Sequence, residues 1–157
     1  MAKIRVSGVI PAPIERVWEY IRDFNGLPKW FPGVTDSHIE AGAALNQAGC
    51  VRNFGLEGGP RIREQLIELS DKNRTCSYKM IESPLPITNY VATVQLTAHG
   101  KDTKIEISSQ FDVLPAHEEE IVGMLTGTYQ GAFDLLKKYF ASDCSTDLRD
   151  SIRKFHP

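Results

Sequence analysis

Hydrophobic and polar residues alternate along several short segments of the chain, a pattern typical of strands with one buried face. In residues 104–113, KIEISSQFDV, every second residue from Ile105 is apolar or small. Residues 3–10, KIRVSGVI, alternate in the same way. Turn sequences such as EGGP and SDKN separate five further segments of strand composition, namely 34–40, 50–56, 61–69, 75–82 and 89–97. This density of strands and short turns predicts one seven-stranded antiparallel sheet.

Helical periodicity marks the remaining segments. After Pro13, a suitable first helical residue, IERVWEYI at 14–21 spaces its apolar residues by three and four, which predicts a short helix. The proline-rich LPKW at 27–30 has room for one further helical turn. Residues 118–140 carry the longest periodic pattern, and their acidic start suits a helix N-terminus. We therefore predict an α+β fold with two short helices after the first strand and a long C-terminal helix.

Gly123, Gly127 and Gly131 share one side of this long helix, at a cost of ~1 kcal/mol each relative to alanine. Close approach of the helix to a strand is the simpler explanation. The alternative is that the missing side chains leave room for a ligand.

A chain of 157 residues is long enough to bury a core as a single domain. We assign residues 1–141 to that domain. The tail, 142–157, has weak apolar spacing and is expected to form at most a short helix.

Composition excludes several classes of partner. The formal net charge is -2 and no basic run is present, so nucleic acid is not expected to bind. No apolar run approaches the ~20 residues that span a bilayer, so integral membrane association is not expected. Three cysteines without a CxxC spacing favour a reducing, cytoplasmic location. The sequence does not fix the oligomeric state, and we allow for a homodimer.

An arginine and a glutamate fall on faces that should be buried. In GCVRNFGL, Arg52 alternates with Cys50 and Phe54, and in RIREQL, Glu64 alternates with apolar residues. If the EGGP turn is centred near Gly58, Arg52 and Glu64 become direct cross-strand neighbours on the inner face. They are either ligand-contacting groups or a buried ion pair with a purely structural role. A pair of that second kind is often no more stabilising than apolar residues, so stability alone explains it poorly.

Alternation sends further polar groups into the same interior, which is typical of a small-molecule pocket. The candidate ligand-binding residues are Arg52, Glu64, Tyr78, Tyr90, Phe54, Ser109 and Trp30. For the two tyrosines a role in core packing is an equal alternative. Ser109 and Trp30 are more simply explained by packing, although Trp30 could line the mouth of a cavity.

Other catalytic patterns are not found. The four histidines are dispersed, so we predict no metal site, and no phosphate loop or serine nucleophile motif indicates a cofactor or hydrolase. Cys50 and Cys76 are interpreted as small buried residues on separate strands.

Several phrases together carry a resemblance to a known family: APIERVWEYIRDFNGLPKWFPGV, GCVRNFGL, RIREQL, SYKMIESPLPITNYVATVQL and SSQFD. Over residues 4–140 the chain resembles the polyketide cyclase/dehydrase branch of the START-like (SRPBCC) superfamily. The resemblance implies a helix-grip fold, in which a curved antiparallel sheet wraps around a long C-terminal helix and encloses a cavity.

Two relatives within this superfamily share the central phrases. In plant lachrymatory-factor synthases an arginine and a glutamate act together on a small substrate, and they match Arg52 and Glu64. Abscisic-acid receptors close two loops over a ligand, and LEGGPR and SPLPIT occupy the gate-like and latch-like positions. Neither loop carries the receptors' signature residues, so hormone sensing is not implied.

Two main hypotheses of function follow. In the first, the protein binds a small hydrophobic or amphipathic molecule, Arg52 holds a carboxylate, enolate or carbonyl oxygen, and tyrosines add hydrogen bonds. In the second, a cofactor-independent cyclase, dehydrase or isomerase uses Glu64 to move a proton and Arg52 to stabilise an oxyanion. A protein-interaction module built on the two loops ranks last.

Overall fold

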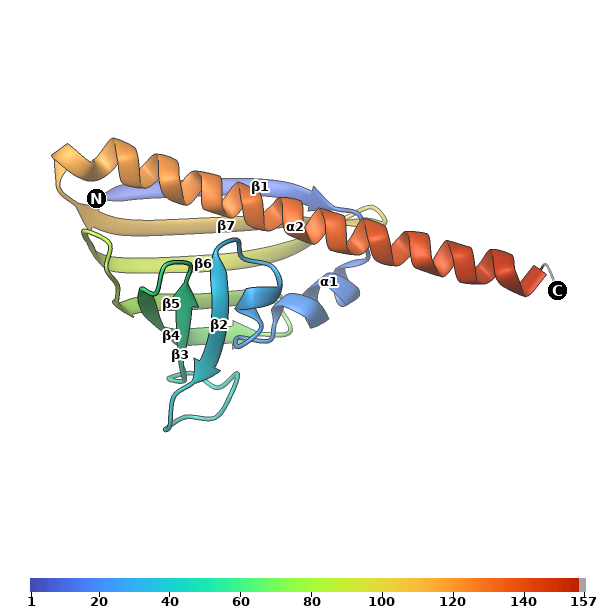
Figure 1. Cartoon of the computed structure of the whole chain (residues 1–157), viewed down its shortest axis with the longest axis horizontal. Coiled ribbons are helices and arrows are strands. Elements are labelled where there is room, and N and C mark those ends of the chain that lie inside the picture. Colours follow the sequence, from blue (N-terminus) through green and yellow to red (C-terminus); the bar gives the residue numbers. More distant parts are fainter. Residues whose placement is uncertain (156–157) are drawn as a thin grey trace.

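Seven strands form a single antiparallel sheet in the order β1-β7-β6-β5-β4-β3-β2 (Figure 1). The computed structural model describes the backbone of residues 1–155 and the side chains of residues 1–141. The strands are β1 (Ala2–Ile10), β2 (Val34–Ile39), β3 (Val51–Leu56), β4 (Arg61–Ser70), β5 (Thr75–Glu82), β6 (Ile87–His99) and β7 (Asp102–Val113). The predicted number and order of strands along the chain are confirmed.

Helices connect the two edges of the sheet and cover one of its faces. α1 (Ile14–Ile21) and the single 3₁₀ turn η1 (Leu27–Lys29) link β1 at one edge to β2 at the other. α2 (Pro115–Phe155) lies along one face and continues past the end of the sheet (Figure 1). The α+β helix-grip fold with a curved sheet is confirmed. The boundary at residue 141 stays a prediction, since the side chains of 142–157 lie outside the described part of the chain.

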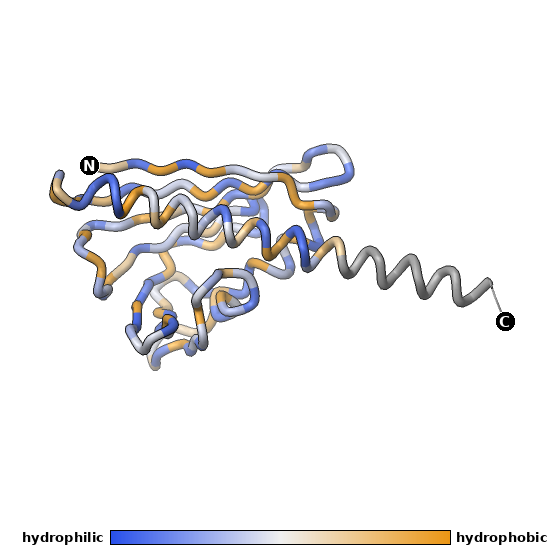
Figure 2. Tube along the Cα trace, turned by 45° about the horizontal axis from the view of Figure 1, so that its top comes forward, coloured by the Kyte–Doolittle hydropathy of each residue, from blue (hydrophilic) through white to orange (hydrophobic). Residues whose placement is uncertain are grey.

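The inner face of the sheet is apolar because the strands alternate as predicted. Along β1 and β7 hydrophobic and hydrophilic residues follow one another (Figure 2). Ile105, Ile107 and Phe111 are completely buried, whereas their neighbours Lys104 and Gln110 face solvent. Burial of these side chains beneath α2 is the main source of stability for such a fold.

A β-bulge interrupts the pairing of β6 with β7. Two β6 residues, Asn89 and Tyr90, lie opposite the single β7 residue Phe111. Asn89 has a left-handed backbone, with φ 55°, and its Nδ2 donates a hydrogen bond to Asp112 Oδ2 over 2.8 Å. Tyr90 keeps the alternation of β6 with Ala92 and Val94 and is buried on the inner face.

Polar contacts fix α1 against the turn between β4 and β5. The indole nitrogen Nε1 of Trp18 donates to Asp71 Oδ1 at 2.8 Å, and Nε of Arg22 donates to the same oxygen at 2.9 Å. The hydrogen bonds from Arg22 and Trp18 lower the pKa of Asp71 below its ordinary value. Trp18 is therefore a packing and anchoring residue, as its position in the helical pattern indicated.

The three glycines of α2 do not bring the helix close to a strand. A Cβ built at Gly123 or Gly127 meets no atom within 4 Å, and one at Gly131 meets Pro32 Cγ at 3.2 Å. Close approach to a strand is therefore wrong as an explanation of the first two positions. Both glycines are exposed beside Met124 and Thr128, residues that line a pocket described below.

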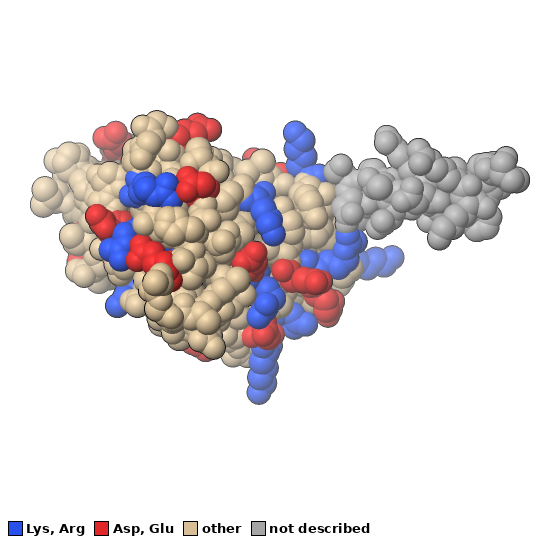
Figure 3. Space-filling model, turned by 60° about the horizontal axis from the view of Figure 1, so that its bottom comes forward, with Lys and Arg blue, Asp and Glu red and all other residues tan. Residues whose placement is uncertain are grey.

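Charged side chains of both signs are interspersed on the face seen in Figure 3, often as direct neighbours. On the outer side of the sheet Arg63 pairs with Glu40 at 2.7 Å and with Glu82 at 3.2 Å, and Arg61 pairs with Asp36 at 2.7 Å. Such mixed surfaces do not resemble the single-sign patches that bind polyanions. Within the described residues, α1 and α2 both lack the long apolar stretch needed to cross a bilayer.

Candidate functional site

Arg52 and Glu64 face each other across β3 and β4 on the inner side of the sheet, as the hairpin register predicted. Nε and Nη2 of Arg52 both donate hydrogen bonds to Oε1 of Glu64, over 3.0 and 2.7 Å. Each residue is only 4% exposed. The pair is thus a buried ion pair in which one carboxylate oxygen receives both donors.

Aromatic rings enclose the guanidinium of Arg52. Its Cζ lies 4.1 Å from the ring centroid of Phe24 and 4.5 Å from that of Tyr78, both within the range of cation–π attraction. Its Nη1 donates to the backbone carbonyl of Phe24 at 3.2 Å. These contacts hold Arg52 in one orientation and leave it little freedom to follow a ligand.

A pocket of about 170 Å³ lies between the sheet and α2, beside the ion pair. Strands β2 to β6, η1 with the segment that follows it, and the middle of α2 all contribute to its wall. Most of the wall is apolar and includes Leu27, Phe31, Val34, Phe54, Ile62 and Leu125. Leu56 of LEGGPR and Leu85 of SPLPIT also line it, so both loops singled out in the sequence border this pocket.

A second polar group in the pocket is a chain of hydroxyls. The hydroxyls of Tyr90 and Tyr129 are hydrogen-bonded to each other, and Tyr129 donates to Ser109 Oγ at 3.0 Å. All three residues are buried, and both tyrosines line the pocket. These hydrogen bonds join β6 and β7 of the sheet to α2, and they fix the positions of the two tyrosine rings.

Two polar atoms that border the pocket have no partner among the residues whose side chains are described. Oε2 of Glu64 receives no hydrogen bond, since both donors of Arg52 reach Oε1. The hydroxyl of Tyr78, a residue 3% exposed, likewise forms none. Neither atom is among the fully enclosed unpaired atoms, and both residues line the pocket. Buried polar atoms are rarely left unpaired unless water or a ligand meets them.

Burial governs the ionisation of these groups. Desolvation raises the pKa of Glu64 above its ordinary value, and the charge and hydrogen bonds of Arg52 oppose this without cancelling it. For Arg52 desolvation is the largest effect and lowers the pKa, but the charge and hydrogen bonds of Glu64, together with Tyr78 and Cys76, outweigh it, so the pKa of Arg52 is raised. Burial also raises the pKa of Tyr78 and Tyr90 well above 10. The tyrosines are therefore neutral hydrogen-bonding groups, whereas Glu64 is the group able to exchange a proton.

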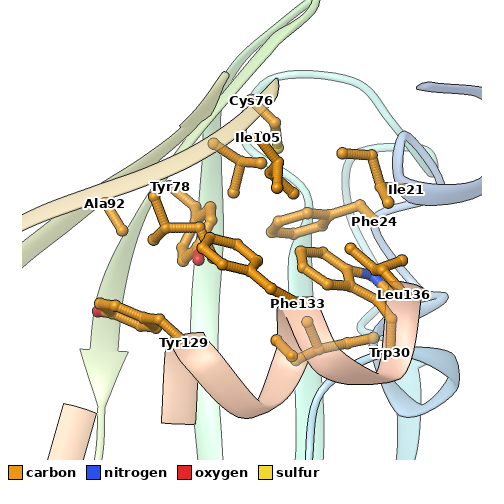
Figure 4. Packing of buried hydrophobic residues seen from close by; sticks show 14 of the residues in the cluster. Ile21, Phe24, Trp30, Cys76, Tyr78, Ala92, Ile105, Tyr129, Phe133 and Leu136 are labelled. Atoms are coloured by element: carbon orange, nitrogen blue, oxygen red, sulfur yellow. The ribbon is translucent and has the colours of Figure 1, made fainter. Parts of the chain in front are cut away.

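The structure brings together five of the seven predicted ligand-binding residues: Arg52, Glu64, Tyr78, Tyr90 and Phe54 all line the pocket. Ser109 does not line it and acts through its bond to Tyr129. Trp30 is not part of the wall either; it lies near Phe24 and Leu136 in the packed interior (Figure 4). A cavity-lining role for Trp30 is therefore not supported, because η1 turns its indole into the core.

Sequence reasoning missed two important residues. Tyr129 is 1% exposed and links α2 to Tyr90, and Phe24 covers Arg52 and accepts its hydrogen bond. Tyr129 lies four residues after Leu125 and four before Phe133, so helical spacing contained the signal. Phe24 lies in an irregular segment after α1, where no periodicity indicates a direction.

Among residues 1–141, whose side chains are described, neither a reactive thiol nor a metal cluster lies at this site. Cys50 and Cys76 are buried and free, as expected, and desolvation raises the pKa of Cys76 to about 11, which keeps it protonated at neutral pH. The side chain of Cys144 lies outside the described residues. In the part of the chain with described side chains, no group of three His, Cys, Asp or Glu residues is arranged to hold a metal ion.

Comparison with known proteins identifies the family. Residues 1–141 match the profile of the family described as "Polyketide cyclase / dehydrase and lipid transport". The chain belongs to this family, and so to the START-like superfamily that its sequence resembled.

Solved structures of similar proteins have the same fold. XoxI from Bacillus cereus is 29% identical, with a TM-score of 0.80 over 90% of this chain and 96% of that one. A protein from Thermobifida fusca is 26% identical with a TM-score of 0.83, covering 90% and 95% of the two chains. A protein from Nitrosospira multiformis is 27% identical with a TM-score of 0.79, covering 92% and 99%. The description of the family names both catalysis and transport, so it leaves the activity open.

Proposed function

We propose that this protein binds a small hydrophobic or amphipathic molecule in the pocket between the sheet and α2. One observation carries the proposal: Oε2 of Glu64 and the hydroxyl of Tyr78 are unpaired polar atoms of residues that line a largely apolar pocket. A structural ion pair needs no such unpaired atoms. Apolar walls with a few oriented polar groups are the usual composition of small-molecule sites.

The size of the pocket limits the ligand. About 170 Å³ is below the ~300 Å³ typical of sites for drug-sized molecules. The expected ligand is therefore compact, such as a single-ring or short-chain compound. Entry between Leu56, Leu85 and Met124 is favoured, since Met124 is 43% exposed and its flexible side chain can move aside.

Native mass spectrometry of the protein from its own host tests the proposal, because a co-purifying molecule would reveal the ligand class. Thr128→Phe should fill the pocket and abolish uptake, whereas Gln130→Phe, on the exposed side of α2, should not. A panel of small alcohols, acids and aromatic compounds, followed by NMR shifts of residues lining the pocket, gives a second readout. If no compound shifts them, the binding function fails.

A second candidate function is a cofactor-independent cyclase, dehydrase or isomerase. The observation in its favour is the geometry of Glu64: Arg52 holds the carboxylate through Oε1, and Oε2 receives no hydrogen bond. The pKa of Glu64 is also raised, which makes the carboxylate a stronger base for proton transfer. The carboxylate would remove a proton from the substrate and return it at another atom, with the hydroxyl of Tyr78 bonded to the developing oxyanion. Glu64→Gln should then reduce turnover far more than binding, whereas equal loss of both would favour the simple binder.

A further inference from the structure

Most of the hydrogen-bonding groups of Arg52 are used by contacts within the protein. Of its five N–H groups, two donate to Glu64 Oε1 and one to the carbonyl of Phe24. The rings of Phe24 and Tyr78 cover its faces at 4.1 and 4.5 Å. Bidentate capture of a ligand carboxylate at the side edge of the guanidinium, formed by Nε and Nη2, would require the bonds to Glu64 to break, and only one further N–H remains on each of Nη1 and Nη2. This geometry argues against the expectation that Arg52 holds a carboxylate.

The charge of the site leads to the same conclusion. Arg52 and Glu64 neutralise each other, and both are 4% exposed. The remaining polar side-chain groups at the pocket are the hydroxyls of Tyr78, Tyr90, Tyr129 and Thr128, which carry no charge. A ligand anion would add an unbalanced buried charge next to Oε2 of Glu64, which costs several kcal/mol in general. A neutral ligand adds no charge to be desolvated.

The unpaired atoms define a complementary ligand. Oε2 of Glu64 is an acceptor that lacks a donor, and the hydroxyl of Tyr78 can both donate and accept. We propose that the pocket selects neutral, hydroxyl-bearing molecules over carboxylates, with the ligand O–H donating to Glu64 Oε2 and Tyr78 donating to a second ligand oxygen. This inference rests on the proposed binding function and specifies its ligand class: small alcohols, enols or phenols.

Matched pairs of probes test the selection. The two pairs are benzyl alcohol with benzoate and cyclohexanol with cyclohexanecarboxylate. In each pair the main difference is that the neutral hydroxyl of the alcohol is replaced by an anionic carboxylate. Binding is measured near neutral pH from the NMR shifts of residues lining the pocket. We expect each alcohol to bind at least about tenfold more tightly than its carboxylate, the factor that corresponds to a difference of about 1.4 kcal/mol.

Glu64→Gln provides a sharper second test, with Glu40→Gln as its matched control. Both glutamates pair with an arginine of another segment, but Glu40 follows β2 and pairs with Arg63 of β4 on the outer face. Glu64→Gln removes the charged acceptor and its repulsion, so alcohol binding should weaken about tenfold while carboxylate binding strengthens. Glu40→Gln should leave both unchanged. Tyr78→Phe, which breaks no hydrogen bond among the described residues, should weaken probes with a second oxygen, such as 4-hydroxyacetophenone.

The possible results separate the two proposals. Carboxylates that shift the pocket residues and bind as tightly as their alcohols, or more tightly, overturn the selection but leave the binding function standing. Probes of both classes that shift nothing in the pocket overturn the binding function itself. If Glu64→Gln does not fold, the wild-type probe pairs and Tyr78→Phe still decide the matter.

Discussion

Gly8 of β1 lies directly against Phe133 of α2: a Cβ built at Gly8 would come within 3.1 Å of Phe133 Cδ2. The long helix therefore approaches the sheet closely at a glycine of the strand. The ring of Phe133 fills the space that a side chain at Gly8 would occupy, and Phe133 itself is buried. This contact sets the separation of α2 from β1 and so the depth of the adjoining interior.

Gly8→Val is expected to destabilise the fold. The valine methyl groups would overlap the ring of Phe133, and overpacking of this kind typically costs about 1–3 kcal/mol. Urea unfolding followed by circular dichroism measures the change. A variant as stable as the wild type would show that α2 can shift away from β1 without loss.

Alanine at Gly123 or Gly127 is expected to stabilise the protein by up to ~1 kcal/mol each. The new methyl group meets nothing within 4 Å, and alanine has the higher helix propensity. Gly131→Ala is the matched control, since its methyl group would press on Pro32 Cγ at 3.2 Å and offset the gain. Thermal unfolding of the three single variants gives the ranking, and equal effects at all three sites would contradict it.

Arg52→Met is expected to cost about 3–5 kcal/mol, because it leaves the buried carboxylate of Glu64 without its partner. The double variant Arg52→Met/Glu64→Leu should recover most or all of that stability, since an apolar pair needs no desolvation of charge. Arg63→Met, on the outer face, should have a much smaller effect. A double variant no better than Arg52→Met alone would show that the pair contributes more than mutual neutralisation.

The ionisation of Glu64 should oppose folding as pH rises. The unfolded chain ionises this carboxyl near 4.5, whereas the folded protein has a higher pKa because the group is buried. The contribution to stability is therefore complete below pH 4.5 and is lost as pH rises through the folded pKa. Urea unfolding at a series of pH values from 4.5 upward should show that the wild-type protein loses stability relative to Glu64→Gln. The opposite trend would mean that Arg52 outweighs burial.

The ionisation of Glu40 should change the stability of the fold in the opposite direction. Hydrogen bonds from Arg63 lower the pKa of Glu40 from 4.5 to about 2. Its contribution is present above pH 4.5 and is lost as pH falls through 2. Glu40→Gln should therefore flatten the acid side of the stability curve between these values. An unchanged acid transition would show that other carboxylates, such as Asp36 or Asp71, control it.

Sequence periodicity could predict the sheet and the central pair because both depend on local rules. Alternation identifies the inner face of each strand, and a tight turn fixes the hairpin register, so Arg52 and Glu64 could be placed opposite each other. The inward directions of Tyr78, Tyr90 and Ser109 follow from the same rule and are confirmed by their burial.

Features that depend on packing between distant segments could not be predicted in this way. Phe24 covers Arg52 although 28 positions separate them, and it lies outside any regular element. Both bonds from Arg52 to Glu64 end on Oε1 and none on Oε2. This detail depends on side-chain rotamers, which periodicity does not specify. For this reason the sequence could place Arg52 at the pocket as a group to hold a carboxylate, enolate or carbonyl oxygen, but it could not show that two of its N–H groups donate to Glu64.

The pairing of β1 with β7 has a consequence for how the protein is made. Ala2 lies opposite Phe111, so the first strand of the sheet to be synthesised has no hydrogen-bonded neighbour until the seventh and last strand, β7, has been made. Chains dominated by such distant contacts fold slowly. The apolar side of β1 must therefore stay shielded during synthesis, and truncation within β7 should yield a product that aggregates instead of a smaller folded domain.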